Sequence, residues 1–344
     1  SNPQAFSDPA TPDTHTMTFT LHRRPGSVVF LDDDPDYLEM LAEVMPSDWH
    51  VRLFMSPVDC IAQLKQEPAR WEADGWRQQE IVHRWQNGTP LIPQILQYWR
   101  DDQTVRFAAT KVCVVDYAMP AMSGLQVLGE LAGWTGYRGL LTGRIEEQLA
   151  VSAFNRGLIE RFVPKQAADI RLRLTGAIQE LLDRPDARHE QTWRSTLSQE
   201  QHALMCDPAI AKPLDEMVRS QGWVEHIVIG APFGILALDS QGLVSWLQLE
   251  PAQKLPELAE MAESQGWNPA MVEDVRAGRK LIDLELELAL GAGRMPEAQA
   301  AFCLAGATGK VYAALFKIDA SLSPAPGDSY ASFIAGREPR KIED

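Results

Sequence analysis

The fold of this chain follows from residues 111–124, which read Lys-Val-Cys-Val-Val-Asp-Tyr-Ala-Met-Pro-Ala-Met-Ser-Gly. The four residues from Val112 to Val115 are too few for a helix and rich in β-branched side chains, so they predict a strand buried on both faces. Asp116 ends this strand, and a proline turn and Gly124 precede the next helical pattern. Open α/β sheets bind their ligands at the carboxyl ends of such strands. We therefore expect the chemistry of the chain near Asp116.

Three further stretches end a predicted strand on polar side chains. Residues 28–35, Val-Val-Phe-Leu-Asp-Asp-Asp-Pro, end in carboxylates, residues 139–143 end on a threonine and a glycine, and residues 161–165 end on a lysine. Strands that alternate with helical patterns predict a parallel sheet, whose carboxyl ends all point to one edge. We therefore expect five side chains to meet there: Asp32, Asp33, Asp116, Thr142 and Lys165.

This series of residues resembles the receiver domain of bacterial two-component response regulators, over about residues 25–182. An acidic pair, an aspartate in a D-x-x-M-P-x-M-x-G context, a threonine, an aromatic residue and a lysine follow in the order of that family. The resemblance implies an α/β, flavodoxin-like fold with a doubly wound, five-stranded parallel sheet. One difference is that Pro164 precedes the lysine, whereas the family has a proline after it.

The resemblance also implies a role for each residue at the predicted edge. Asp116 would be the phosphoacceptor, phosphorylated by a sensor histidine kinase or a histidine phosphotransfer protein. Asp32, Asp33 and Asp116, with the backbone carbonyl of Ala118, would bind Mg²⁺ or Mn²⁺. Thr142 and Lys165 would assist the phosphoryl transfer, and Phe162 would be the aromatic residue of the switch.

Physical chemistry agrees with these roles. Clustered carboxylates repel one another unless a cation is present, and Mg²⁺ favours carboxylate, carbonyl and phosphate oxygens. A carboxylate can attack a phosphoryl group, and an ammonium group can neutralise charge on the phosphoryl oxygens. Each residue alone has a simpler interpretation: a solvated carboxylate, a surface lysine, a core phenylalanine or a turn threonine. Asp34, directly before Pro35, is expected to cap a helix.

Composition and charge exclude several classes of protein. A chain of 344 residues, 45% of them hydrophobic, can form two domains with cores of their own. The net charge of −15 argues against DNA binding, and residues 190–344 carry 13 Lys and Arg against 22 Asp and Glu. No apolar run is long enough to span a membrane. The four cysteines lack metal-ligand spacing and are typical of reduced thiols in a cytoplasmic protein.

An insertion at about residues 66–110 separates the second predicted strand from the strand of Asp116. We expect two helices there, at about 69–87 and 92–101, broken by Asn87-Gly88-Thr89-Pro90. The insertion is rich in tryptophan, which permits two interpretations. The tryptophans pack on the extended second helix as a satellite core, or they form a surface that binds a protein partner.

The remaining segments are predicted from local patterns. Residues 1–24 are expected to be a disordered lead, 183–221 a linker with helices, and 321–344 a flexible tail. Residues 222–320 predict an α+β domain with an antiparallel sheet: strands at 233–238 and 243–249, helices at 256–265 and 269–277, and strands at 281–290, 298–305 and 310–318. That order resembles a PAS domain. His189-Glu190 is not assigned as a phosphorylated histidine, because no glycine-rich nucleotide-binding stretch follows it.

The sequence thus predicts a phosphorylation-controlled switch with a protein-binding output, and not an enzyme with turnover. The output would act through the tryptophan-rich insertion, through the C-terminal domain or by pairing of two chains as a homodimer. Two other functions stay open. The receiver fold can serve as a dimerising scaffold, or residues 223–320 can form a PAS-like ligand sensor that the receiver modulates.

Overall fold

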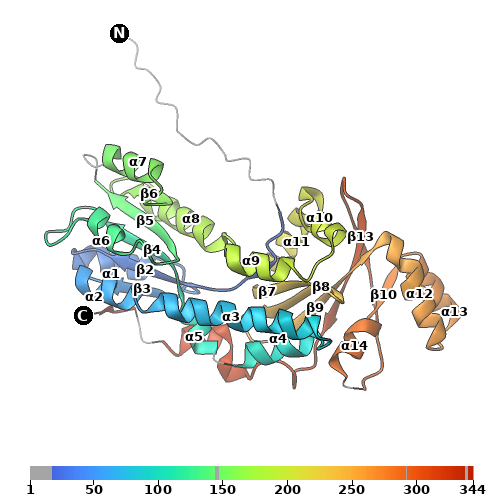
Figure 1. The fold of residues 1–344 in the computed structure, drawn as a ribbon. Helices are drawn as coiled ribbons and strands as arrows, with labels where there is room; N and C mark the ends of the chain where they lie inside the picture. The colour runs from blue at the N-terminus through green and yellow to red at the C-terminus, as the bar shows by residue number, and fades with distance from the viewer. Residues whose placement is uncertain (1–17, 102, 144–146, 292, 338–339, 344) are drawn as a thin grey trace, which may run out of the picture.

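Two six-stranded sheets organise the chain, one parallel and one antiparallel (Figure 1). The computed structural model describes residues 18–101, 103–143, 147–291, 293–337 and 340–343. Helix α3 (Glu67–Gln86) of the insertion runs from the parallel sheet to the antiparallel one, so the insertion lies along both sheets (Figure 1). Among the described helices, none combines the length and the apolar content needed to cross a bilayer.

The parallel sheet forms from the short apolar runs in the first half of the sequence. Strands β2 (Ser27–Leu31) and β4 (Thr110–Asp116) are buried along their whole length, which explains their unbroken apolar pattern. Helices α1 (Pro35–Val44) and α8 (Ile170–Asp183) pack on one face of the sheet. The other face is covered by α2 (Pro57–Leu64), α6 (Gly124–Glu130) and α7 (Glu147–Asn155). The strands, in spatial order, are β14 (Ile342–Glu343), β3 (Val51–Phe54), β2 (Ser27–Leu31), β4 (Thr110–Asp116), β5 (Tyr137–Thr142) and β6 (Arg161–Pro164).

The doubly wound parallel sheet is confirmed, but it has six strands instead of five. The sixth strand, β14, comes from the segment that the sequence predicts as a flexible tail, and it pairs with the edge strand β3. Arg340 donates hydrogen bonds to the carbonyls of Ala42 and Met45, and Arg52 pairs with Glu343 at 2.8 Å. An unpaired sheet edge offers backbone groups to any extended segment. The prediction of a flexible tail is therefore wrong for its described residues, which also include α15 (Tyr330–Ala335).

The N-terminal segment is also packed where the structure describes it. Residues 1–17 of the predicted disordered lead lie outside the described residues. Beyond them, β1 (His22–Arg23) pairs with β7 (Trp223–Gly230). Phe19 is buried and stacks on the His226 ring, with 5.0 Å between the ring centroids. The expectation of disorder is therefore wrong for residues 18–24, because two apolar side chains, Phe19 and Leu21, anchor a segment too short to show a pattern.

The predicted hairpin is confirmed at the centre of the antiparallel sheet, where β8 (Phe233–Asp239) pairs with β9 (Val244–Pro251). Two predictions around it are corrected. Strand β7 precedes the hairpin and was not predicted, and residues 284–290 form helix α14 (Leu284–Leu290) instead of a strand. A PAS-like domain is therefore not confirmed. The strands, in spatial order, are β1, β7, β8 (Phe233–Asp239), β9 (Val244–Pro251), β13 (Lys310–Lys317) and β12 (Phe302–Ala305), with β10 (Lys280–Ile282) and β11 (Ala298–Ala300) forming a separate pair.

Helix α14 shows why its sequence misleads. The alternation Leu-Glu-Leu-Glu-Leu at 284–288 is typical of a half-buried strand. In the structure Glu287 lies on the buried face, where its carboxylate pairs with Arg294 at 2.7 Å, and Leu288 is 80% exposed. A buried glutamate whose charge is paired thus makes a helix with a period of 3.6 look like a strand with a period of two.

The helices of this half agree with the sequence. The predicted pair that follows the hairpin is α12 (Leu255–Ser264) and α13 (Pro269–Arg276). The helical region that precedes it contains α9 (Ala187–Arg194), α10 (Gln199–Met205) and α11 (Pro208–Ser220). Two single turns of 3-10 helix, at Ala252–Lys254 and Pro326–Asp328, complete the described elements.

The insertion joins the core of the antiparallel half and does not form a satellite core on the second helix. Its helices are α3, α4 (Leu91–Arg100) and α5 (Gln103–Ala108), of which the last was not predicted. Trp99 is fully buried and donates its indole N–H to Glu225 of β7, at 2.9 Å. Trp76, in contrast, is 60% exposed. Most of the apolar surface of the insertion is therefore used inside the molecule.

Glu250, on β9, should make the stability of the protein depend on pH. Burial and the neighbouring Glu285 carboxylate raise its pKa from 4.5 to about 8. The unfolded chain loses this proton above about pH 4.5, whereas the folded chain keeps it up to about pH 8. Folding therefore binds a proton between these values, and the stability that Glu250 contributes falls as the pH rises.

We expect Glu250→Gln to remove the loss of stability that the ionisation of Glu250 causes at high pH. The melting temperature should rise by about 2–4 °C at pH 8 and by much less at pH 4.5, since glutamine does not ionise. Thermal unfolding of both proteins across this pH range measures the difference. Glu263→Gln, at an exposed position of α12, is the control and should leave the pH profile unchanged. A gain that is the same at every pH would contradict the assignment to a titrating carboxyl.

Candidate functional site

Three carboxylates meet at the carboxyl edge of the parallel sheet. Asp32 follows β2 and Asp116 ends β4, and the two strands are neighbours in register, with Leu31 opposite Val115. One oxygen atom from each of Asp32, Asp33 and Asp116 lies within 4.8 Å of the others. Asp32 and Asp116 are buried, and Asp33 is half-buried. The structure thus brings together the three acids that the sequence analysis places at one edge.

Lys165 reaches this cluster from the end of β6. Its Nζ lies 2.5 Å from Asp32 Oδ2 and 2.9 Å from Asp116 Oδ1. Burial lowers the pKa of Lys165, but its hydrogen bonds with the two carboxylates outweigh this effect, so the pKa is raised and the ammonium group keeps its charge. The preceding Pro164 does not turn the side chain away, because the Lys165 N–H donates to the Thr142 carbonyl at 2.9 Å and holds the backbone against β5.

Backbone contacts fix the two buried carboxylates. Asp116 Oδ2 accepts from the N–H of Ala118 at 3.1 Å, and Asp32 Oδ1 accepts from the N–H of Asp34 at 3.0 Å. Asp34 itself caps α1, as predicted, by accepting from the N–H groups of the first turn. Gly124 is required by its surroundings, since a Cβ there would lie 2.3 Å from the Asp116 carbonyl oxygen.

The two predicted switch residues lie on the neighbouring strands β5 and β6, and Phe162 stands two residues before the end of β6. Thr142 ends β5 with its side chain fully buried, and its hydroxyl makes no hydrogen bond. A buried hydroxyl without a partner is costly, so it is available to a group that enters the site. Phe162, on β6, is half-buried and makes an edge-to-face contact with Phe154, at 6.5 Å between centroids.

Tyr37 also belongs to this site, although the sequence analysis assigns it no role. Its ring lies 4.5 Å from Lys165 Nζ. Burial and the charges of Asp32 and Asp116 raise the pKa of its hydroxyl. The available signal was its place in the first turn of a helix that begins at the acidic edge.

The residues present fit a hard divalent cation. Carboxylate oxygens are the ligands that Mg²⁺ and Mn²⁺ prefer, and half-buried Asp33 lies on the open side of the cluster. Asp32, Asp33 and Asp116 would hold the ion. Burial is the largest effect on Asp32 and raises its pKa despite Lys165, which shows that one ammonium group does not fully compensate the buried charge. Participation of the Ala118 carbonyl stays a prediction.

Comparison with known proteins gives a similarity that extends over nearly the whole chain. No protein-family model matches the chain, and no curated protein sequence matches it. Among solved structures, the Legionella pneumophila response regulator LqsR aligns with a TM-score of 0.68 and 21% identity, over 94% of this chain and 97% of LqsR. The protein therefore shares the fold of LqsR over both of its sheets.

Other matches cover about half of the chain. A response regulator receiver domain from Clostridium thermocellum covers 46% of this chain and 94% of its own, with a TM-score of 0.30 and 16% identity. FixJ-N covers 48% and 98%, with a TM-score of 0.32 and 19% identity.

Proposed function

We propose that this protein is a two-component response regulator that accepts a phosphoryl group on Asp116. The observation that carries the proposal is the geometry of Lys165, whose ammonium group contacts Asp32 and Asp116 together beside Asp33. A structural ion pair needs one carboxylate, whereas a phosphoacceptor site needs several acids, a cation site and a mobile ammonium group. The shared fold with LqsR, a response regulator, supports the same conclusion.

The donor would be the phosphohistidine of a sensor kinase or of a phosphotransfer protein. An oxygen of the Asp116 carboxylate attacks phosphorus, the bond from phosphorus to the histidine nitrogen breaks, and the imidazole keeps the electron pair and takes up a proton. The product is an acyl phosphate on Asp116. A bound Mg²⁺ would supply positive charge to the phosphoryl oxygens. Lys165 moves toward the same oxygens, and Thr142 donates its unpaired hydroxyl to one of them.

The signal would leave the site through β6 and α8. Withdrawal of Thr142 and Lys165 toward the phosphoryl group frees space for Phe162 to turn inward. Helix α8 is followed, after residues 184–186, by α9, whose Trp193 is buried in the core of the antiparallel half. Movement of α8 would therefore change how that half is presented to a protein partner or to a second copy of the chain. The protein acts as a switch and not as an enzyme with turnover.

Labelling with acetyl phosphate and Mg²⁺ tests the proposal. The wild-type chain should gain one phosphoryl group, as measured by intact mass, and Asp116→Asn should gain none. Asp36→Asn, which changes an exposed aspartate of α1, is the matched control and should label like the wild type. If the wild type fails to label, the fold serves as a scaffold. Equal labelling of Asp116→Asn would move the phosphoacceptor elsewhere.

A further inference from the structure

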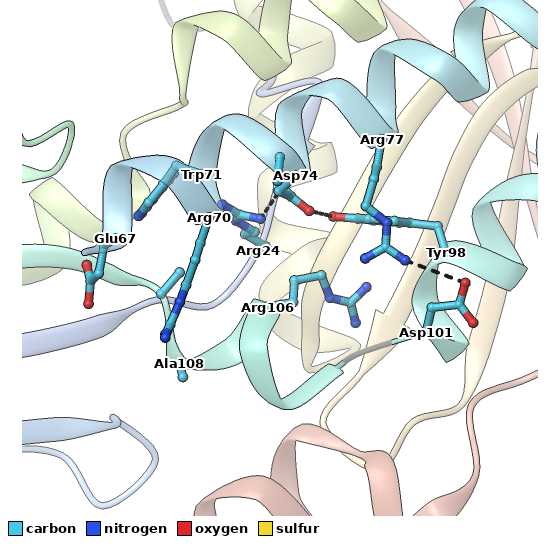
Figure 2. A pocket seen from close by; sticks show the side chains of 12 residues that line it. Arg24, Glu67, Arg70, Trp71, Asp74, Arg77, Tyr98, Asp101, Arg106 and Ala108 are labelled. Atoms are coloured by element: carbon cyan, nitrogen blue, oxygen red, sulfur yellow. Dashed lines mark hydrogen bonds and ion pairs between the residues drawn. The ribbon is translucent and has the colours of Figure 1, made fainter.

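A second cavity, away from the carboxylate cluster, lies where the helical insertion meets the N-terminal strand. Its volume is ≈ 220 Å³, and its walls come from α3, α4, α5 and the segment that follows β1. Figure 2 shows four arginines around it, Arg24, Arg70, Arg77 and Arg106, together with the aromatic rings of Trp71 and Tyr98. None of these residues belongs to the Asp116 site.

Arg106 is the central feature of this cavity. The residue is only 5% exposed, and none of its three guanidinium nitrogens makes a hydrogen bond. Its nearest counter-charge is Glu225, with 3.3 Å between Arg106 Nη2 and Glu225 Oε2. The ion pair balances the charge but leaves the N–H donors of Arg106 without acceptors. Buried donors without acceptors are rare in native proteins, because each loses its bonds to water.

A second donor in the same cavity is also without an acceptor. The indole nitrogen of Trp71 is buried and makes no hydrogen bond. Arg70, exposed at the mouth, has no ion pair or hydrogen bond with any residue that the structure describes. The other arginines are paired, Arg24 with Asp74 at 2.6 Å and Arg77 with Asp101 at 3.6 Å. The cavity therefore presents donors in excess, which is the arrangement that receives an oxyanion.

The aromatic residues define the rest of the ligand. The centroid of the Tyr98 ring lies 5.3 Å from Arg106 Cζ and 5.9 Å from Arg77 Cζ. Its hydroxyl is already used, because it donates to Asp74 Oδ1 at 2.7 Å. The Arg24 guanidinium lies over the Trp71 ring, with 4.8 Å between Arg24 Cζ and the ring centroid. The walls thus offer flat apolar surface beside a cationic end, as in sites for small organic acids.

We propose that this cavity binds a small organic anion, with a carboxylate or phosphate group at Arg106 and an aromatic or apolar body against Trp71 and Tyr98. The oxyanion would accept from the Arg106 guanidinium in a bidentate manner. The Trp71 indole N–H is a further donor in the wall of the same cavity. Arg70 and Arg77 would steer it from the mouth. Binding at this cavity is independent of phosphorylation at Asp116.

Calorimetric titration with matched probes tests this site. Benzoate and phenyl phosphate carry the two candidate oxyanions on the same ring, and benzyl alcohol is the neutral control. At least one anion should bind saturably with one site per chain, benzyl alcohol should not bind, and inorganic phosphate should bind more weakly than phenyl phosphate. The better of the two ring anions identifies the oxyanion. Absence of saturable binding by both, or equal binding of benzyl alcohol, would overturn the proposal.

Variants locate the binding site. Arg106→Gln should raise the dissociation constant at least about tenfold, because it removes the bidentate contact. Should that variant fail to fold with Glu225 left unpaired, the double variant Arg70→Gln/Arg77→Gln, at two exposed positions, should still weaken binding severalfold. Arg84→Gln, on the exposed side of α3, is the matched control. Asp116→Asn should bind like the wild type. Unchanged affinity in the Arg70→Gln/Arg77→Gln protein, or lost affinity in Asp116→Asn, would contradict this site.

Discussion

Lys165→Met should slow phosphoryl incorporation at Asp116 by about 10²–10³-fold, the usual cost of removing one preorganised donor from a developing oxyanion. In the structure the ammonium group contacts both Asp32 and Asp116, so it is already placed beside the attacking carboxylate. Methionine keeps most of the side-chain volume and removes only the charge. The rate of labelling by acetyl phosphate at saturating Mg²⁺ measures the loss.

The same variant should respond more strongly to divalent cations. Without the ammonium group, the negative charges of Asp32 and Asp116 repel each other more strongly. A bound cation therefore relieves more repulsion than it does in the wild type. The rise in melting temperature on adding Mg²⁺ should therefore be larger in Lys165→Met. Lys65→Met, at an exposed position directly after α2, where the lysine pairs with Glu130, is the control for both measurements. An unchanged labelling rate in Lys165→Met would show that the lysine is only structural.

Trp193→Ala should lower the free energy of unfolding by about 3–5 kcal/mol, the range for removing a large buried aromatic side chain. Trp193 lies on α9 with no exposed surface, and its indole N–H donates to Gln78 Oε1 on α3 at 2.7 Å. Alanine leaves a cavity and also takes a partner from a fully buried amide. Urea unfolding followed by far-UV circular dichroism measures the difference.

The control for this change is a tryptophan of α3, the helix that Trp193 contacts through Gln78. Trp76 is 60% exposed and contacts Arg188 at 5.5 Å from the ring centroid. Trp76→Ala should lower the free energy of unfolding by no more than about 1 kcal/mol, which is the contribution of an exposed cation–π contact. Comparable losses from the two substitutions would mean that α9 does not join the insertion to the antiparallel half.

The predictable part of the molecule depends on residues close in sequence. The strand that ends at Asp116 is a continuous apolar run, and its polar end and the glycine that follows lie within a few positions of one another. The parallel arrangement then brings Asp32, Asp33 and Lys165 to the same edge, because parallel strands share their direction. The fold of the first half and the residues of the candidate site could therefore be predicted together.

The parts that could not be predicted depend on partners distant in sequence. Strand β14 has two residues and forms only because β3 has a free edge. Helix α14 was misread for a different reason, because its burial does not follow residue type: Glu287 is buried and Leu288 is exposed. The place of the insertion depends on contacts of Trp99 with Glu225, which is 126 residues away. Hydrophobic periodicity does not contain this information, since it describes the face of an element and not the element that covers it.

Formation of an acyl phosphate on Asp116 is tested most directly by identifying the modified residue. The protein is labelled with acetyl phosphate and Mg²⁺, reduced with borohydride and digested for peptide mass spectrometry. Reduction converts an aspartyl phosphate to homoserine, so we expect homoserine at position 116, in the peptide that contains the end of β4. Homoserine at another position, or an unmodified Asp116 in a protein that carries phosphate, would contradict it.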